Sequence, residues 1–480
     1  MSLRKSAYVS VLWTSLQQFA NQGVNFVVGV VLARILSPSE FGLLAMIYIF
    51  IGISNVLINS GLSSSLIRTK DADDEDFSTV FFFNLAMSIF FYVLIFLVAP
   101  LIADFYSQPA LVHIIRLYCL TFIIGAITTV QAVQLQKQLN FKIETIASIS
   151  SNVVAGITGI TLAYQHFGVM TLVWMALISG FTKSFIFWWK SDWRPSFVFS
   201  KKKFKFHFRF GVNLTFTSIL DVIFENIYNI YIGKFYSPLQ LGLYNRADSL
   251  KQLPVSNVLG VLGKITYPLF SQFSDDNEKL KIAYKEVMIT ICFFITPVLI
   301  ISGVLGKPLI VSLFSEKWID SVPYFQILCI VGVFYPLRVY NTNIFLVKGR
   351  SDLFFKLEIV KKVIFILIFI VSFKFGIYGL LWGQVFYNVI SYVIESVFAG
   401  KFINYTFFEQ FKAILPVFLI GISSGLVTLL FINVLSFNGN ILNLILGGLV
   451  GCCSFLVFVK ILKIQIPRVL VDLLKFKNNE

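Results

Sequence analysis

Ser37-Pro38-Ser39-Glu40-Phe41-Gly42-Leu43 recurs later in the chain as Ser237-Pro238-Leu239-Gln240-Leu241-Gly242-Leu243. The two copies share the serine, the proline, the glycine and the final leucine, and each follows a basic residue, Arg34 or Lys234, at the same distance. Proline and glycine interrupt helices, so each copy predicts a break between two helical segments. A motif that returns at matching places indicates an internal repeat.

Two more pairs of segments extend this repeat in the same order. Phe141-Lys142-Ile143-Glu144 is matched by Phe355-Lys356-Leu357-Glu358, and Phe167-Gly168-Val169 is matched by Phe375-Gly376-Ile377. The offset between the copies changes only across predicted loops. The sequence therefore predicts two related units that follow each other along the chain.

Between these motifs the chain is strongly apolar. Hydrophobic residues make up 57% of the chain and charged residues 13%, whereas a soluble domain usually carries about 25% charged residues. The apolar residues come in runs of roughly 20, the length that crosses about 30 Å of hydrocarbon. This pattern predicts a polytopic integral membrane protein. The five cysteines fall inside apolar runs and lack the spacing of a zinc site or a disulfide framework.

We expect an all-α membrane fold with about fourteen transmembrane helices. The predicted spans lie near 9–33, 41–60, 79–102, 111–132, 143–163, 168–189, 211–233, 246–270, 285–305, 321–346, 355–374, 376–399, 412–433 and 440–460. They form an N-terminal six-helix lobe, a basic cytoplasmic link, a C-terminal six-helix lobe, and a last segment with helices 13 and 14 and a basic cytoplasmic tail: 1–189, 190–210, 211–400 and 401–480. Six spans per lobe make the repeats parallel, related by an axis along the membrane normal.

Lysine and arginine set the expected orientation. Cytoplasmic loops carry an excess of these residues, and most of them fall on the side that holds both termini and the 190–210 link. We therefore expect both termini to be cytoplasmic. The net charge is +15. The basic residues that produce it lie between apolar runs, where membrane topology explains them better than nucleic-acid binding does. The basic, phenylalanine-rich link suggests either an interfacial anchor or a site for anionic lipid headgroups, and the anchor is favoured.

The sequence around the repeated motif is also the most specific feature of the chain. An apolar first helix leads into Leu32-Ala33-Arg34-Ile35-Leu36-Ser37-Pro38-Ser39-Glu40-Phe41-Gly42, and the second lobe carries Leu241-Gly242-Leu243-Tyr244-Asn245-Arg246-Ala247. Together they resemble the polysaccharide-unit flippases, which are bacterial O-antigen, capsule and exopolysaccharide exporters of the multidrug/oligosaccharidyl-lipid/polysaccharide (MOP, MATE-like) superfamily. The resemblance covers the whole chain in span count, lobe order and motif placement.

The resemblance implies a transporter of the bacterial inner membrane rather than an enzyme, with no cofactor. Its substrate would be an undecaprenyl-pyrophosphate-linked oligosaccharide, moved from the inner to the outer leaflet by alternating access through a cavity between the lobes. Membrane lipids, a coupling cation (proton or sodium) and a polysaccharide polymerase are the candidate partners that go with this activity.

Polar stripes on two predicted helices are candidates for the cavity lining. The stripe on helix seven recurs every four residues and comprises Asn213, Thr217, Asp221, Glu225 and Asn229. Asp221 lies about 15 Å into its span, and ionisable groups at that depth are functional candidates because their burial in lipid is costly. Asp221 and Glu225 suit a sugar cavity or a coupling-cation site, with an interhelical hydrogen-bond seam as the alternative. On helix one, Asn21 and Asn25 suit sugar hydroxyls or a packing seam.

Cations are the natural partners of a pyrophosphate. The inner halves of four predicted helices hold such residues: Lys183, Lys264, Arg338, and Lys361 or Lys362. A cluster of them would take a pyrophosphate, whereas isolated lysines would extend toward the interface. Arg338 is the strongest candidate. Arg246, beside Asp248 at the outer start of helix eight, is a further one, and Arg34 is expected to be a structural anchor because it lies off the helix-one stripe.

Three other activities compete with this interpretation. A cation-coupled multidrug exporter of the same superfamily would have twelve spans. A lipid II flippase would favour an arginine-rich first helix, and within the predicted first helix and its exit motif the sequence has only Arg34. A membrane glycosyltransferase or polymerase would need a long outer loop, and the predicted outer loops are all short. Gly260-Val261-Leu262-Gly263-Lys264 is too short for a Walker motif and lies within a span.

Overall fold

The computed structural model describes residues 3–435 and 439–462, and within them every side chain except those of residues 3–11, 213, 214, 261 and 264. Across these ranges the secondary structure consists of α-helices and two short 3-10 helices, without a strand. The all-α class is thereby confirmed. The predicted basic tail, from residue 463 onward, lies outside the described residues.

The chain divides into two compact units, residues 1–242 and 243–480. The helices of the first unit are α1 (Leu3–Ile35), α2 (Pro38–Asn59), α3 (Leu62–Arg68), α4 (Asp74–Tyr106), α5 (Ala110–Tyr118), α6 (Leu120–Lys137), α7 (Phe141–Tyr164), α8 (Met170–Lys190) and α9 (Lys201–Phe235). The boundary falls in the first turns of α10 (Pro238–Gln272).

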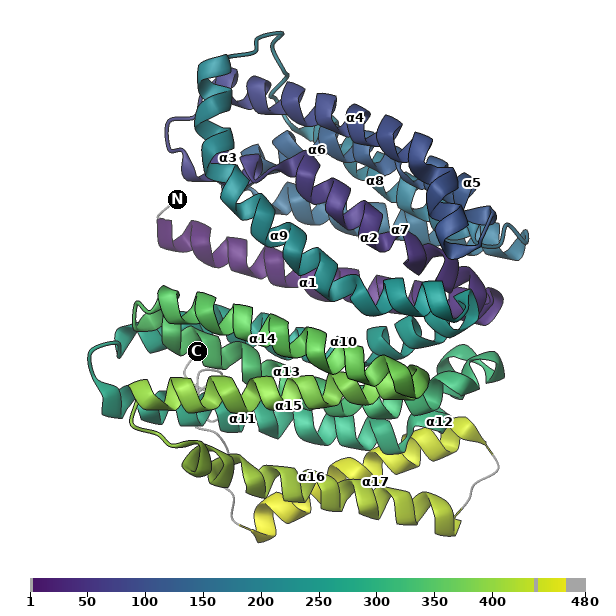
Figure 1. Ribbon diagram of the computed structural model, residues 1–480, viewed down its shortest axis with the longest axis vertical. Helices are drawn as coiled ribbons and strands as arrows, with labels where there is room; N and C mark the ends of the chain where they lie inside the picture. The colour runs from purple at the N-terminus through teal and green to yellow at the C-terminus, as the bar shows by residue number, and fades with distance from the viewer. Residues whose placement is uncertain (1–2, 436–438, 463–480) are drawn as a thin grey trace. The chain divides into compact units, whose positions relative to one another are not determined.

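The second unit continues from α10 (Figure 1). Its further helices are α11 (Asn277–Val304), α12 (Gly306–Phe314), η1 (Glu316–Ser321), α13 (Val322–Val347), α14 (Ser351–Ser372), η2 (Phe373–Phe375), α15 (Gly376–Phe402), α16 (Phe407–Leu435) and α17 (Asn440–Ile461). The last two helices pack against each other and against α11, and α17 also contacts α12.

Each predicted span overlaps a helix of the structure. Ten helical stretches of the described residues are long and apolar enough to cross a membrane, and one of them joins α14 and α15 over Ser351–Phe402. The three helices α1, α9 and α10 carry polar residues along their length and are not among these ten. The multi-pass membrane class is therefore confirmed, and the number of crossings stays a prediction.

The repeated Ser-Pro motif begins a helix in both places. At α2 the Glu40 carboxylate accepts a hydrogen bond from the Ser37 N–H at 2.6 Å, and at α10 the Ser237 hydroxyl accepts one from the Gln240 N–H at 3.2 Å. Such caps satisfy N–H groups that a helix start leaves without partners. The proline fits because the first turn needs no N–H from it. The motif thus encodes a capped helix start as well as a break.

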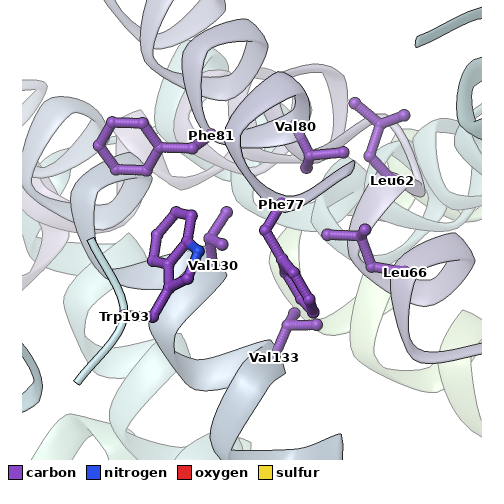
Figure 2. Packing of buried hydrophobic residues seen from close by; sticks show 8 residues of the cluster. All are labelled: Leu62, Leu66, Phe77, Val80, Phe81, Val130, Val133 and Trp193. Atoms are coloured by element: carbon purple, nitrogen blue, oxygen red, sulfur yellow. The ribbon is translucent and has the colours of Figure 1, made fainter. Parts of the chain in front are cut away.

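The 190–210 link is folded onto the first unit through an apolar cluster. Figure 2 shows Trp193 of the link beside Phe81 and Val130, which belong to α4 and α6. The Trp193 ring centre lies 6.1 Å from that of Phe77 and 6.0 Å from that of Phe81. Burial of a large aromatic side chain is strongly favourable, so the link has a fixed place on this unit.

An ionic cluster fixes the same link a few residues later. The Lys203 ammonium lies 2.5 Å from Asp73 and 3.0 Å from Asp76 at the start of α4. The fully buried His207 ring contacts Asp76 at 3.0 Å and Ser65 of α3 at 2.8 Å. Helix α9 continues from these contacts and packs on α2, α3 and α4. The first compact unit therefore includes the link and all of α9, and the division into lobes at residue 211 stays a prediction.

Candidate substrate-binding site

Three helices of the second unit bring together a cluster of four charged side chains, of which Lys361 and Glu395 are buried and the other two are half-buried. Helix α13 contributes Arg338, α14 contributes Glu358 and Lys361, and α15 contributes Glu395. Lys361 lies ten residues into α14, or about 15 Å along its axis. The end of α13, the start of α14 and the end of α15 lie on the same side of the unit, so the four groups share one depth within the helix bundle.

Lys361 is held between two carboxylates. Its side chain is 4% exposed, and its ammonium forms ion pairs with Glu358 at 2.5 Å and with Glu395. Glu358 follows from the helix itself, because residues three apart lie on one face. Glu395 comes from the neighbouring helix and is 1% exposed. Removal of both charges from water is costly unless they stay paired, so this pair fixes how α14 and α15 pack.

Arg338 is the second cation of the cluster, and the hydrogen-bonding groups of its guanidinium are not all used. Its guanidinium lies 5.1 Å from the Tyr335 ring centre and 5.4 Å from the Tyr387 ring centre. Its charge also acts on the Glu395 carboxylate. The Arg338 Nη1 atom is buried and, within the described part of the chain, has no hydrogen-bond partner. Because guanidinium N–H groups fit phosphate oxygens in pairs, this geometry suits an anion.

The cluster also holds one open acceptor. The second oxygen of Glu395, Oε2, is buried and lacks a partner among the described residues. Two cations and two carboxylates leave the cluster close to neutral, and buried polar atoms normally have hydrogen-bond partners. The open donor on Arg338 and the open acceptor on Glu395 are therefore the positions where a bound polar group would gain most.

The other predicted inner-half cations lie elsewhere. Lys183 is in α8 of the first unit, where its half-buried ammonium lies 5.6 Å from the Phe187 ring centre, one helical turn away. The Lys264 side chain lies outside the described residues. Of the predicted cations, the structure thus brings Arg338 and Lys361 together, and a pyrophosphate role for Lys183 or Lys264 stays a prediction.

The helix-seven stripe corresponds to α9 in the first unit. Asp221 and Glu225 are exposed and one turn apart, close enough for their charges to interact. Asn213 falls outside the described side chains, and Asn229 donates a hydrogen bond to Asn226 Oδ1 at 3.1 Å. The described residues contain no group of three or more histidines, cysteines or acidic residues that could hold a metal ion. A cation site at Asp221 and Glu225 stays a prediction.

The helix-one stripe is divided between packing and exposure. Asn21 donates a hydrogen bond to the Ser148 hydroxyl of α7 at 2.7 Å. One turn earlier, the Thr145 hydroxyl donates to the Trp13 carbonyl at 3.1 Å. These contacts join α1 to α7, as the packing-seam alternative expects. Asn25 is exposed, and its role in substrate binding stays a prediction.

Arg246 occupies an aromatic pocket at the start of α10. Its guanidinium lies 4.9 Å from the Phe314 ring centre and 5.0 Å from the Trp318 ring centre. Asp248, which the sequence suggested as its neighbour, instead pairs with Lys251 at 2.7 Å. A cation–π contact of this kind is worth about 0.5–2 kcal/mol. This contact gives Arg246 a packing role, and its role in substrate binding stays a prediction.

Sequence reasoning missed the two carboxylates of the cluster. Glu395 is a lone acidic residue in an otherwise apolar stretch of α15, which is the same signal that selected Arg338. Glu358 ends the repeated Phe355-Lys356-Leu357-Glu358 segment. A search for cations alone, guided by the expected pyrophosphate, passed over both, although every buried cation needs a counter-ion.

Comparison with known proteins identifies the family. The model of a family described as polysaccharide biosynthesis protein matches residues 31–323. The chain is 25% identical over 430 residues to the teichuronic acid biosynthesis protein TuaB of Bacillus subtilis (strain 168), with 89% of each chain covered. It is 26% identical over 441 residues to the lipopolysaccharide biosynthesis protein WzxC of Escherichia coli (strain K12), again with 89% of each covered.

Solved structures show the fold. The lipid II flippase MurJ in an inward closed conformation is similar with a TM-score of 0.74 and 15% identity, over 94% of this chain and 98% of that chain. An inward-facing multidrug resistance MATE family transporter of the MOP superfamily is similar with a TM-score of 0.62 and 17% identity, over 82% and 98%. These likenesses confirm the predicted MATE-like fold. With the family model covering more than half of its length, the chain belongs to the polysaccharide biosynthesis protein family.

Proposed function

We propose that this protein is a flippase that moves an undecaprenyl-pyrophosphate-linked oligosaccharide repeat unit from the inner to the outer leaflet of a bacterial cytoplasmic membrane. Membership of the polysaccharide biosynthesis family supports the substrate class. The MATE-like transporter fold supports transport by alternating access. Both termini and the 190–210 link are cytoplasmic in this proposal, in line with the distribution of lysine and arginine.

The observation that carries the proposal is the half-buried Arg338 guanidinium, which stacks on two tyrosines while its buried Nη1 atom has no partner among the described residues. A lipid-linked sugar has a bulky polar head, and its pyrophosphate is the one group with formal charge in every repeat unit. A single fixed guanidinium can orient that group whatever the attached sugar. Lys361 supplies a second positive charge once a phosphate oxygen competes with Glu395 for it.

The test is display of surface polysaccharide in the native host lacking its own copy of this gene. We expect Arg338→Gln to abolish display and to cause lipid-linked repeat units to accumulate in the inner leaflet, while the amount of inserted protein stays normal. Arg338→Lys should restore part of the activity, because the charge is kept and the paired N–H geometry is lost.

Arg350→Gln is the matched control, since Arg350 lies near the same end of the unit in an exposed pair with Asp352 at 2.9 Å. Normal display from Arg338→Gln would remove the cluster from the mechanism. Normal polysaccharide combined with a block in lipid II export after deletion of the gene would assign the protein to cell-wall precursor transport instead. A coupling cation and a polymerase partner belong to this proposal as further components to be tested.

A further inference from the structure

A second charged feature of the second unit lies at the N-terminal ends of α11 and α16. There a cavity of about 480 Å³ is lined by three lysines, two glutamates and a tyrosine: Lys281, Lys285, Lys412, Glu278, Glu409 and Tyr405. We call it the lysine pocket. The Arg338 cluster lies between α13, α14 and α15 and shares none of these residues.

Two of the three lysines have no hydrogen-bond or ion-pair partner among the residues that the structure describes. Lys281 donates a hydrogen bond to the Asn404 carbonyl at 3.0 Å, and its ammonium lies 5.3 Å from the Tyr405 ring centre. Lys285 and Lys412 are exposed and make no hydrogen bond or ion pair within the described ranges. Lys281 and Lys285 lie one turn apart on the same face of α11, where like charges repel. An anion in the pocket would relieve this repulsion.

The glutamates of the lysine pocket do not cancel its positive charge. Glu409 caps the start of α16, where its carboxylate accepts hydrogen bonds from the Thr406 N–H and hydroxyl, both at 2.8 Å. Glu409 keeps its negative charge and interacts with Lys281, so three ammonium groups face two carboxylates and the pocket keeps an excess of positive charge. The starts of α11 and α16 also direct the positive ends of two helix dipoles toward this region.

Depth and neighbouring apolar groups identify the kind of anion. Lys281 and Lys412 lie four and five residues into their helices, or about 6–8 Å along the axis, which matches the thickness of a headgroup layer. Ile282, which also lines the pocket, is 57% exposed. Phe408, in the first turn of α16, is 80% exposed. A ligand that places an anionic group on the lysines would therefore lay hydrocarbon against these side chains.

We propose that the lysine pocket binds the phosphodiester headgroup of an anionic phospholipid, in the leaflet where α11 and α16 begin, which is the inner leaflet in the proposed topology. Basic pockets between transmembrane helices on the cytoplasmic side are suited to such headgroups. Helix α16 lies outside the sequence repeat and packs on α11, so this site exists only because the two additional helices are present. The bound lipid would fasten α16 to the lobe.

The experiment uses the full-length protein purified in a neutral detergent, with phosphatidylglycerol, phosphatidylcholine or inorganic phosphate as the probe. Native mass spectrometry counts bound lipid, and thermal unfolding measures stabilisation. We expect phosphatidylglycerol to bind and stabilise, and phosphatidylcholine and phosphate to do neither. Lys285→Gln with Lys412→Gln should weaken phosphatidylglycerol binding about tenfold or more, because hydrogen bonds to charged groups are lost.

The matched control is Lys201→Gln with Lys202→Gln, which removes two exposed lysines at the start of α9. This variant should bind phosphatidylglycerol like the unaltered protein, and Lys285→Arg with Lys412→Arg should keep the affinity. Equal losses of phosphatidylglycerol binding in the two double glutamine variants would overturn the proposal in favour of unspecific attraction. Unchanged binding in both variants would overturn it as well. Equal stabilisation by phosphate would replace the lipid with a free anion. Lipid binding is measured without transport, so its failure leaves the flippase proposal untouched.

Discussion

The Pro238 carbonyl oxygen lies 1.8 Å from the position that a Cβ atom on Gly42 would occupy, and the Pro38 carbonyl oxygen lies 1.9 Å from the corresponding position on Gly242. Each copy of the repeated motif thus places its proline carbonyl against the glycine of the other copy. The reciprocal contact holds the first turn of α10 against the first turn of α2. The glycines are needed because only a residue without a side chain allows this approach.

Substitution of these glycines should therefore disrupt the fold. We expect Gly42→Ala or Gly242→Ala to lower the amount of folded, inserted protein severalfold, because an added methyl group would overlap backbone atoms that cannot move independently. The measurement is the monodisperse fraction of protein extracted from membranes, seen by fluorescence-detected gel filtration. Gly125→Ala is the control, since nothing lies within 4 Å of its Cβ position. Equal yields from all three variants would show that the two helix starts are farther apart than the structure has them.

The positions of the helices and their caps were predictable from sequence because both are local properties. Runs of apolar residues mark the spans, and the Ser-Pro motif with Glu40 three residues after Ser37 marks a capped start. The placement of α9 was not predictable from sequence, because its polar stripe does not indicate which helices it will contact. In the structure it belongs with α2, α3 and α4 through Lys203 and His207.

The candidate site was predictable only in part, for a similar reason. The sequence singled out Arg338, and Lys361 or Lys362, as charges within apolar spans. Hydropathy gives the same signal for a lysine that extends to the interface and for one that is buried in a pair. The partner that decides between these outcomes, Glu395, is 34 residues away from Lys361 and on another helix. Only the packing of α14 on α15 reveals it.

The buried pair between Lys361 and Glu395 should be energetically coupled. Lys361→Met leaves Glu395 without its counter-ion, and loss of one partner of a buried pair typically costs about 3–5 kcal/mol. Glu395→Gln combined with Lys361→Met should cost less than the sum of the two single changes. The measurement is a double-mutant cycle on the free energy of unfolding in detergent micelles.

The control for this cycle is Lys279→Met, which removes an exposed partner of Asp276 at 2.9 Å. This change should lower the free energy of unfolding by no more than about 1 kcal/mol, as for other surface ion pairs. Additive effects of Lys361→Met and Glu395→Gln would show that the two side chains do not interact in the folded protein.

The contact between Asp73 and Lys203 should make stability depend on acid pH. The hydrogen bond from Lys203 lowers the pKa of Asp73 from 3.8 to about 2. A lowered pKa in the folded state stabilises the fold above the unfolded value, and this contribution is lost as the pH falls from about 4 toward 2. Asp76 and Glu75 face the same ammonium, and the His207 ring contacts Asp76.

Asp73→Asn tests this because asparagine still caps α4 but carries no charge. We expect the unfolding temperature of the unaltered protein to exceed that of Asp73→Asn near pH 6 and to converge with it as the pH falls through about 4 toward 2. Asp71→Asn lies at an exposed position earlier in the same loop, and its unfolding temperature should change with pH in the same way as that of the unaltered protein. A constant difference in unfolding temperature between Asp73→Asn and the unaltered protein over the whole pH range would rule out the ionised Asp73 as the cause of the pH dependence.

Asp221 provides the last prediction, on the role of the α9 stripe in transport. The Asp221 and Glu225 side chains are exposed one turn apart on a helix expected to cross the membrane. Charges at such a depth persist only where they meet water, a counter-ion or a substrate. Asp221→Asn keeps the size and hydrogen-bonding capacity of the side chain and removes its charge. We expect it to abolish polysaccharide display while inserted protein stays at its normal level.

The control for this change is Thr215→Ala on the same helix. The Thr215 hydroxyl donates a hydrogen bond to the Gly211 carbonyl of its own helix at 3.0 Å. It should leave display unchanged. A stripe that binds a coupling cation would make the Asp221→Asn defect insensitive to a raised supply of substrate, whereas a stripe that binds sugar would let excess lipid-linked substrate restore part of the transport. Normal display from Asp221→Asn would instead assign the stripe to helix packing, because an isosteric amide preserves a hydrogen-bonded seam.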